Sequence, residues 1–229
     1  MEDSINKKFD PELNSIRGLT WLPWIGRDYL TGGVLLLGES HYCYENYTPK
    51  DIENYRQETR EVIEEYATRG KNAGNQWKTY EPMEAVVNGI MNLSEGKIWS
   101  NVSYMNLIQK CMDNNNARPH WEDFLFGWKI VLQVINILRP AICVCFSTDK
   151  KNNRVNFNRL EEFKSMVNFD YSIIPTEDTS QRISRCIVAK PAEITIDEYN
   201  CKIVFVQHAS RIKGKNITEW NEIIKQNLN

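Results

Sequence analysis

The sequence predicts an α/β protein, a three-layer αβα sandwich with a mostly parallel central sheet of about four strands. Short aliphatic runs such as residues 34–37 have the composition of strands that are buried on both faces of a sheet. Longer segments with apolar residues at helical spacing separate these runs. Strands that alternate with helices in this way are typical of parallel sheets covered by helices on both faces.

The length and composition indicate one globular domain. A chain of 229 residues is long enough for a single hydrophobic core, so we expect one domain over residues 1–229, with flexibility at the ends and above all in residues 1–15. No apolar run approaches the roughly 20 residues that span a bilayer, and the first ten residues are polar and charged. These features predict a soluble, cytoplasmic protein without a membrane partner, and a monomer by default.

The first central strand is predicted at residues 34–37, which are entered through glycine and left through Gly38. Thr48 then offers an N-cap hydroxyl, followed by a proline and, three residues after the cap, by Asp51. This is the pattern of a helix start. Apolar residues recur at helical spacing as far as Gly70, where a glycine can end a helix. We therefore expect one helix between Thr48 and Gly70.

The remaining elements follow from the same two periodicities. Residues 74–82 are predicted to be a loop, and residues 98–108 to be a strand followed by a polar loop or short helix. A long apolar helix is expected over residues 121–138, because Arg139-Pro140 stops the pattern. We also predict helices over residues 83–93 and 156–168 and at the C-terminus, and strands at residues 141–146, 185–189 and 202–206.

Charge and cysteine content exclude some classes of function. The net charge of −2 gives no global attraction to nucleic acid, so any such contact must be local, at Lys150, Lys151 and Arg154 or at Arg211, Lys213 and Lys215. The six cysteines form no Cys-x-x-Cys pair and are expected to be reduced and buried. Alternation along a strand points the thiols of Cys143-x-Cys145 into the core, so we expect no metal and no cofactor.

Two polar motifs follow predicted central strands, and ligands of parallel sheets bind beyond the carboxyl ends of strands. In Gly38-Glu39-Ser40-His41-Tyr42, the carboxylate and the imidazole suit proton transfer. The alternative, equally weighted, is that Glu39 caps the next segment and His41 satisfies a buried backbone group. In His208-Ala209-Ser210, the imidazole beside Arg211 can stabilise an anion, or it can be structural, whereas His120 lies at a helix start away from this edge.

Two other residue types are candidates for ligand contacts. Asn101 and Asn106 each carry an amide that can read a donor and an acceptor together, although amides also close turns. Aromatic residues near the first motif can hold a planar base or pack in the core; these are Trp21, Trp24, Tyr42, Tyr44 and Tyr47.

The order of these motifs resembles the uracil-DNA glycosylase superfamily. Residues 38–42 are similar to that superfamily's first motif, and residues 204–210 are similar to its strand that ends in His-Pro-Ser. Between them, residues 99–109 resemble the segment that supplies a base-reading asparagine. The resemblance extends in order from about residue 21 to the C-terminus.

The resemblance implies the three-layer αβα fold and excision of a damaged or modified base from DNA after base flipping. It implies that His208 stabilises the departing base anion, that Asn106 reads the base edge and that Glu39 orients water, with His41 beside it. Gly38, Ser40 and Ser210 would contact the substrate, and Tyr42 or a neighbouring aromatic residue would stack on the base. Arg211, Lys213 and Lys215 would grip DNA phosphates.

Three functions compete at this point. The first is a monofunctional DNA N-glycosylase that acts in DNA repair by base excision. The second is a non-catalytic nucleic-acid-binding or defence module on the same fold. The third is a hydrolase that uses Ser40 or Ser210 with a histidine; it ranks last because the Gly-x-Ser-x-Gly elbow is missing from the sequence.

Overall fold

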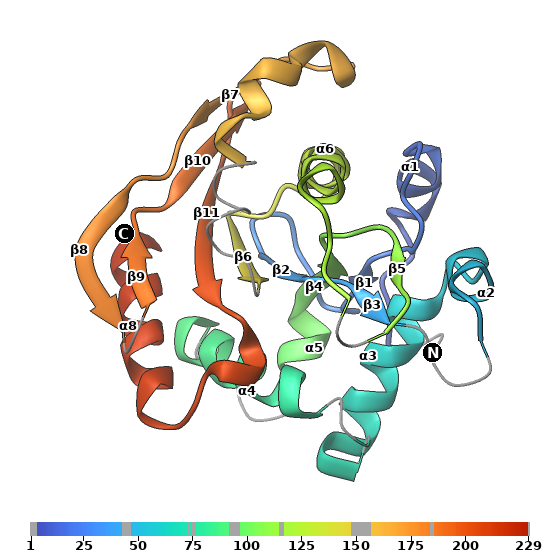
Figure 1. The fold of residues 1–229 in the computed structure, drawn as a ribbon, viewed down its shortest axis with the longest axis horizontal. Helices are drawn as coiled ribbons and strands as arrows, with labels where there is room; N and C mark the ends of the chain where they lie inside the picture. The colour runs from blue at the N-terminus through green and yellow to red at the C-terminus, as the bar shows by residue number, and fades with distance from the viewer. Residues whose placement is uncertain are drawn as a thin grey trace.

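The computed structural model describes residues 4–42, 47–72, 74, 77–91, 97–114, 117–147, 157–183 and 186–228. Within these ranges the chain is an α/β protein built on a mixed seven-stranded sheet of order β1-β4-β2-β6-β11-β10-β7 (Figure 1). In chain order the strands are β1 (Trp24–Ile25), β2 (Val34–Gly38), β4 (Val102–Asn106), β6 (Ile142–Ser147), β7 (Tyr171–Ile174), β10 (Ala192–Ile196) and β11 (Tyr199–Gln207).

The predicted parallel sheet of about four strands is the core of this larger sheet. Strands β4, β2, β6 and β11 are parallel to one another, whereas β1, β10 and β7 extend the sheet with antiparallel pairs. Strand β10 was not predicted, because its five residues alternate between buried and half-buried and include Glu193 and Thr195. A short alternating strand with polar residues on one face lacks the continuous apolar run that marks the central strands.

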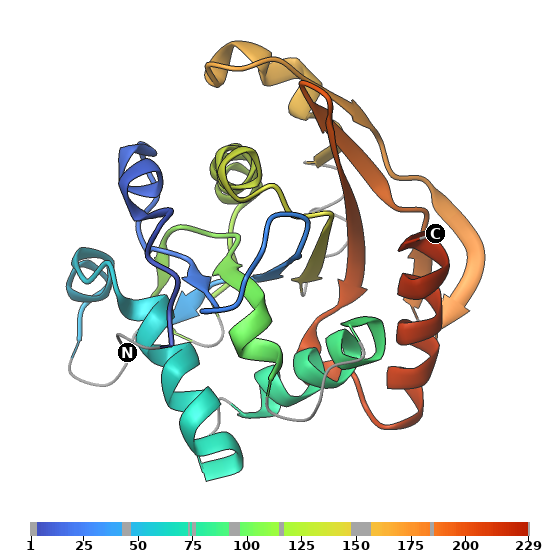
Figure 2. The same ribbon diagram turned by 180° about the vertical axis from the view of Figure 1, so that it is seen from behind.

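Helices cover both faces of the sheet, as the sequence predicted. Leu35 and Leu37 of β2 belong to one apolar cluster, together with side chains of α6 (Trp121–Leu138) and α1 (Asp10–Ser15). Val34 and Leu36 point to the other face, because successive side chains of a strand alternate. That face is covered by α3, α4, α5 and α8, and Figures 1 and 2 show α6 and α4 on opposite sides of the strands.

The single helix expected between Thr48 and Gly70 is two helices, α2 (Pro49–Asn54) and α3 (Glu58–Arg69). The start was correctly predicted, since the Thr48 hydroxyl accepts from the Asp51 N–H and completes a capping box. The chain leaves the helix at Tyr55, and the carbonyl of Arg56 instead accepts the N–H of Leu22. A tertiary hydrogen bond therefore breaks a pattern that is periodic in the sequence.

Two other local predictions were wrong. Helix α4 (Trp77–Met91) begins inside the segment expected to be a loop and contains Pro82. Residues 98–108 have the reverse of the expected order: the short helix α5 (Ile98–Asn101) precedes strand β4. The strand is in the second half of this segment because residues 102–106 are the ones that pair with β2. In this pairing Val102 lies opposite Val34, and Asn106 lies opposite Gly38.

The last third of the chain departs most from expectation. Part of the helix predicted over residues 156–168 is a 3-10 helix, η3 (Leu160–Met166). A hairpin of β8 (Asp178–Ile183) and β9 (Cys186–Ala189) includes the strand predicted near residue 185. The terminal helix is α8 (Lys215–Leu228). The basic cluster Lys150, Lys151 and Arg154 lies outside the described residues.

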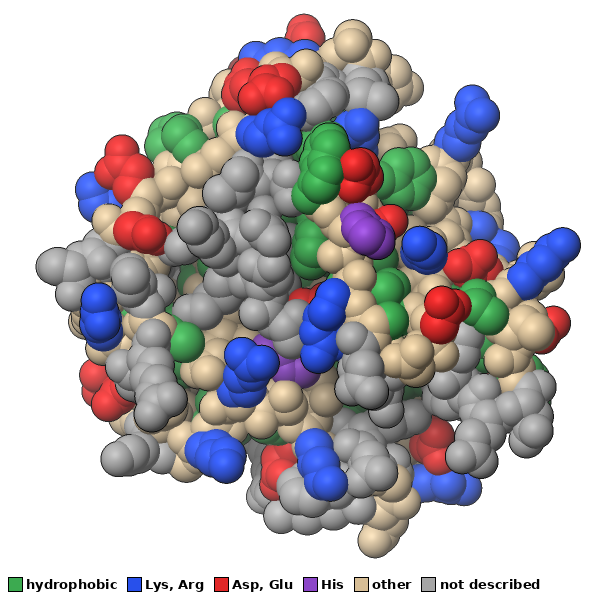
Figure 3. All heavy atoms as spheres, viewed as in Figure 1, with side chains coloured by type: hydrophobic (Ala, Val, Ile, Leu, Met, Phe, Trp, Pro, Cys, Tyr) green, Lys and Arg blue, Asp and Glu red, His purple; other side chains and the backbone are tan. Residues whose placement is uncertain are grey.

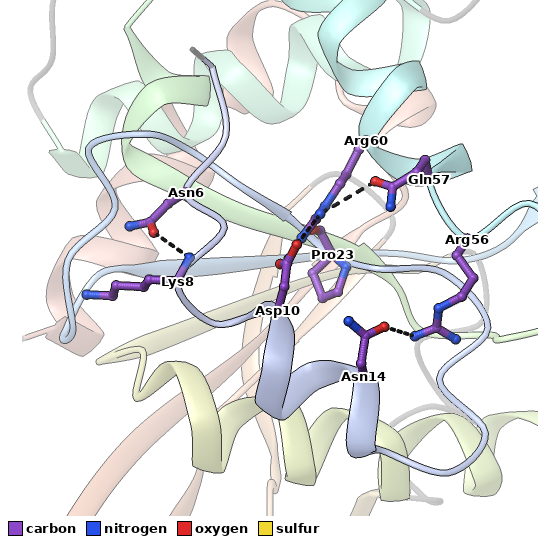
Figure 4. A network of polar contacts seen from close by, with 8 residues as sticks. All are labelled: Asn6, Lys8, Asp10, Asn14, Pro23, Arg56, Gln57 and Arg60. Carbon is purple, nitrogen blue, oxygen red and sulfur yellow. Dashed lines mark hydrogen bonds and ion pairs between the residues drawn. The ribbon is translucent and has the colours of Figure 1, made fainter. Parts of the chain in front are cut away.

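A buried ion pair joins the N-terminal segment to α3 (Figure 4). The Arg60 side chain is 1% exposed and donates to both carboxylate oxygens of Asp10, at 2.6 and 2.9 Å, and to the carbonyl oxygen of Pro23 at 2.9 Å. Leu13 of α1 is buried in the same segment. The flexibility expected of residues 1–15 remains a prediction, although this part of the segment contributes to the core.

The order of the parallel strands decides where a ligand can bind. Across the core the four parallel strands lie in the order β4, β2, β6 and β11. The first of them in the chain, β2, therefore lies between the second, β4, and the third, β6. The connection from β2 to β4 runs over one face through α3 and α4, and the connection from β4 to β6 runs over the other through α6. Connections that diverge in this way open a crevice beyond the carboxyl ends of the two central strands, which are β2 and β6. Among the described residues no helix is long and apolar enough to cross a membrane.

Candidate functional site at the carboxyl edge of the parallel strands

The candidate site is the set of polar side chains that follow β2, β4 and β11 at their carboxyl ends. Glu39 and Ser40 follow β2, Asn106 ends β4, and His208 follows β11. The sequence predicted that the two polar motifs share this edge, and the parallel register places them there. Adjacent strands lie about 4.8 Å apart, so β2 and β11, with β6 between them, are separated by about 10 Å.

Asn106 packs directly on Gly38. The two residues oppose each other in the β2–β4 ladder, and a Cβ atom on Gly38 would lie 2.2 Å from both Asn106 Oδ1 and Tyr104 Oη. Any larger residue at position 38 would displace the asparagine side chain. The Tyr104 hydroxyl donates to Asn106 Oδ1 at 2.7 Å, and Gln109 Nε2 donates to the Asn106 carbonyl oxygen at 2.6 Å. Hydrogen bonds therefore fix both the side chain and the backbone of this asparagine.

Glu39 and Ser40 lie in the turn after β2. The Glu39 side chain is 4% exposed, and its backbone carbonyl accepts the Ile108 N–H at 2.9 Å. Burial and the neighbouring Glu39 carboxylate raise the pKa of the Cys145 thiol of β6, so the carboxylate lies toward the central strands. Ser40 Oγ is buried and has no hydrogen-bond partner among the described residues. A ligand group can supply that partner.

His41 and Tyr42 form the short strand β3, which pairs with β5 (Cys111–Met112). The His41 ring is 6% exposed, its Nε2 lies 2.9 Å from Thr59 Oγ1, and it packs edge-on against Trp21. Burial lowers the pKa of His41 to about 4. This imidazole is neutral at pH 7 and has one nitrogen engaged by the helix α3 hydroxyl, an environment that favours a positioning role over direct proton transfer.

His208 is held in one tautomer by the 3-10 helix η4 (Ala209–Arg211) that follows it. Its Nδ1 accepts the Ser210 N–H at 3.3 Å and lies 2.8 Å from Ser210 Oγ. A backbone N–H can only donate, so the proton of the neutral ring is on Nε2. Burial, Arg211 and Arg118 lower the pKa of His208 to about 4. At pH 7 this residue therefore presents an uncharged N–H donor beside two guanidinium groups.

The basic residues predicted to contact DNA lie on and after η4. Arg211 and Lys213 are exposed, and Lys215 is the first residue of α8, its side chain outside the described set. Arg118, in the segment between β5 and α6, is close enough to His208 to lower its pKa. Figure 3 shows several Lys and Arg side chains in the lower centre of one face. Positive charge from two separate segments thus lies near His208.

Several residues weighed from the sequence have structural roles. Asn101 Nδ2 donates to the Lys97 carbonyl oxygen within α5. The indole N–H groups of Trp21 and Trp24 donate to the carbonyl oxygens of Ile52 and Trp99 in the core. Tyr47 is 59% exposed, and Tyr44 lies outside the described residues. His120 precedes α6, as expected.

The structure adds three residues to the site. Tyr104 holds the Asn106 amide; Gln207, the last residue of β11, carries a buried Oε1 that has no partner among the described residues; and Arg118 lies near His208. Unpartnered atoms of this kind also occur away from the edge, in Asn88, Trp99 and Asn136. The i, i+2 spacing of Tyr104 and Asn106 on a strand is the one signal in the sequence that could have identified such a pair.

The candidate site is built from side chains of different chemistry. Within the part of the chain that the structure describes, no group of three or more His, Cys, Asp or Glu residues could hold a metal ion. The edge instead combines a carboxylate, a fixed amide and a neutral imidazole donor. No protein-family model matches the chain, and no curated protein matches it in sequence.

Proposed function

We propose that this chain is a DNA glycosylase-like hydrolase that flips a damaged or modified base out of DNA and cleaves its N-glycosidic bond. The proposal includes the finer fold assignment, a three-layer αβα sandwich of the uracil-DNA glycosylase superfamily. The observation that carries it is the contact of Gly38 with Asn106 in the β2–β4 ladder. That contact joins the two segments whose order in the sequence resembles the superfamily.

The geometry supports a division of roles along the edge. Asn106 would read the edge of the flipped base, and His208 Nε2–H would donate to the base from β11. Strands β4 and β11 are three strand spacings apart, about 14 Å, a distance that the two side chains, a planar ring and a hydrogen bond of about 2.9 Å at each end of the ring would span. Arg211 and Arg118, beside His208, would contact phosphates of the DNA strand that carries the flipped base.

In the proposed reaction, water attacks the anomeric carbon and the bond from that carbon to the base nitrogen breaks. The base leaves with the bonding electrons as an anion. His208, which is neutral, stabilises this anion by donating a hydrogen bond from its Nε2–H. Glu39 orients the water and accepts its proton. Preorganised donors aimed at developing negative charge supply the largest single contribution in many enzymes, and general-base assistance adds typically 10²–10⁴-fold.

The test is mass spectrometry of bases released from DNA that carries uracil, hypoxanthine, alkylated bases or hypermodified pyrimidines. We expect one of these bases to be released, with Glu39→Gln and His208→Ala each lowering the rate by about 10²–10³-fold. His120→Ala is the matched control, because this histidine is exposed and lies at the start of α6. Salt-sensitive DNA binding without any base release would instead select the non-catalytic binding module.

A further inference from the structure

Gln109 is a buried glutamine whose side chain connects two segments that are far apart in the sequence. It is 6% exposed and lies shortly after the end of β4. Its Oε1 accepts the N–H of Thr20 at 3.0 Å and that of Trp21 at 3.4 Å. Its Nε2 donates to the carbonyl oxygen of Asn106 at 2.6 Å. One side chain therefore ties the end of β4 to the segment that precedes β1.

The orientation of the Gln109 amide is fixed by its partners. A backbone N–H can only donate and a carbonyl oxygen can only accept, and the two ends of the amide face backbone groups of these two kinds. Turning the amide over would place its NH2 group against two N–H donors and its oxygen against the Asn106 carbonyl oxygen. The amide therefore has one orientation, in which a donor faces Asn106.

The hydrogen bond from Gln109 fixes the peptide group that follows Asn106. The carbonyl of that peptide accepts Gln109 Nε2, and its N–H, which belongs to Leu107, donates to the carbonyl oxygen of Gly38 at 3.1 Å. A peptide group is planar, so one that is held at both ends cannot rotate without losing a hydrogen bond. Since the Asn106 side chain leaves the backbone next to this peptide, its direction depends on Gln109.

Gln109 is also connected to the turn after β2. The N–H of Ile108, in the turn that Gln109 closes, donates to the Glu39 carbonyl oxygen at 2.9 Å. Trp21, whose N–H Gln109 accepts, packs edge-on against His41 with the ring centroids 4.5 Å apart. Gln109 therefore reaches the first polar motif by two routes, in addition to its direct bond to the end of β4.

We propose that Gln109 is a positioning residue of the candidate site, which keeps the Asn106 amide and the Glu39 carboxylate at the spacing that base release requires. This inference rests on the proposed function and adds to it a residue that acts from behind the site, without contacting the base. Misplacement of a reacting group by about 1 Å can lower a rate by about 10²-fold. DNA affinity depends mainly on phosphate contacts, so the rate of base release should fall while DNA affinity is kept.

The most informative variant is Gln109→Glu, because it changes only the donor end of the amide. The carboxylate still accepts the Thr20 N–H, but it places a charged oxygen against the Asn106 carbonyl oxygen. Burial raises the pKa of a carboxyl group, and below that pKa the protonated acid donates to Asn106 again. Base release is measured on the DNA that the wild type cleaves. We expect a rate about 10²-fold below wild type at pH 8 and within about tenfold of wild type at pH 5.

Gln109→Met and Gln133→Glu are the comparison variants. Gln109→Met keeps the length of the side chain without any polar atom, so its rate should be about 10²-fold lower at both pH values. Gln133 is the matched control, because its Nε2 also donates to a backbone carbonyl, that of Lys129 within α6. Gln133→Glu should keep the wild-type rate to within about threefold at both pH values. DNA affinity, measured by fluorescence anisotropy, should be unchanged in every variant.

Thr20→Val is a milder variant that serves if the Gln109 variants fold poorly. It removes only the hydrogen bond from the Thr20 hydroxyl to the Gln109 carbonyl oxygen, which is 2.6 Å long. We expect it to lower the rate of base release by about threefold, the effect of one net hydrogen bond.

The outcomes separate this inference from the proposed function. A rate in folded Gln109→Glu that equals that of Gln133→Glu, or that stays reduced at pH 5, would overturn the inference and leave the proposed function intact. So would DNA affinity that falls in proportion to the rate, or, where the Gln109 variants do not fold, a wild-type rate in Thr20→Val. Absence of base release by the wild type would overturn the proposed function and this inference with it.

Discussion

Two buried polar clusters of this chain differ in how completely their polar atoms are hydrogen-bonded. At the junction of α1 and α3, the Arg60 guanidinium is paired with both oxygens of Asp10 and with the Pro23 carbonyl (Figure 4). At the carboxyl edge of the sheet, Ser40 Oγ and Gln207 Oε1 are buried without a partner among the described residues. Buried polar groups are ordinarily hydrogen-bonded, and an unpaired one is destabilising.

The difference separates a structural cluster from a candidate site. At the α1–α3 junction the fold pairs the buried Arg60 charge with a carboxylate and a backbone carbonyl. It leaves two neutral polar atoms without a described partner at the edge where parallel sheets bind ligands. Asn88, Trp99 and Asn136 also have such atoms, so the position at this edge, and not the missing partner alone, marks the candidate site. Removing a structural polar group should therefore lower the stability of the fold strongly. Removing a polar group of the site should change the stability little but weaken ligand binding.

The largest effect is expected at the α1–α3 junction. Asp10→Ala leaves the Arg60 charge, 1% exposed, without its carboxylate, and removing one partner of a buried ion pair costs about 3–5 kcal/mol. Urea unfolding followed by tryptophan fluorescence measures the loss. Asn14→Ala, which removes an exposed hydrogen bond to Arg56, should change stability by less than about 0.5 kcal/mol. Equal losses in the two variants would contradict the structural assignment.

The next effect is a loss of stability in acid that depends on His41. Burial lowers the pKa of His41 from 6.5 to about 4, so between these pH values the unfolded chain binds a proton that the folded chain does not. Stability therefore falls as pH falls through this window, by up to about 3 kcal/mol from this residue. Urea unfolding at pH 7 and pH 5 should show a shallower loss in His41→Asn than in wild type. Between pH 7 and pH 8 the residue should contribute no change.

A smaller effect of opposite sign is expected in the site. Ser40→Ala removes a buried hydroxyl that lacks a described partner, so stability should stay the same or rise by up to about 1 kcal/mol. Gln207→Met should behave alike, and both variants should weaken ligand binding or base release. Thr59→Ala is the control, because its hydroxyl is hydrogen-bonded to His41 and its removal should lower stability by about 1–2 kcal/mol. Destabilisation by Ser40→Ala of the same size would assign Ser40 to the structural class.

The smallest effect concerns charge at the edge. Arg211→Gln should reduce the slope of the logarithm of DNA affinity against the logarithm of salt concentration by about 0.9, the value for one phosphate contact on duplex DNA. Fluorescence anisotropy over a salt series measures it. Arg27→Gln is the control, because Arg27 lies at the opposite edge of the sheet. It pairs with Asp28, and the Asp28 N–H donates to the carbonyl oxygen of Ser100, just before β4 begins. Identical slopes for all three proteins would remove Arg211 from the DNA contact.

The central strands and the long apolar helix were predictable from the sequence because burial leaves a continuous or periodic apolar pattern. Residues 34–37 and 203–206 are such runs, and each lies in a strand of the parallel core. The antiparallel strands β7 and β10 and the break between α2 and α3 were not predictable in this way. They depend on partners far away in the sequence, such as the Leu22 N–H that bonds the Arg56 carbonyl.

For the candidate site, the sequence by itself determined which residues follow the central strands: Gly38, Glu39 and His208 are at the ends of apolar runs whatever their neighbours are. Only the tertiary structure decided which of them meet and in what state. Strand register sets Asn106 on Gly38, and burial holds His208 neutral with its proton on Nε2. The physical reason is that strand propensity acts through neighbouring residues, whereas pairing, burial and proton position depend on groups that only folding brings together.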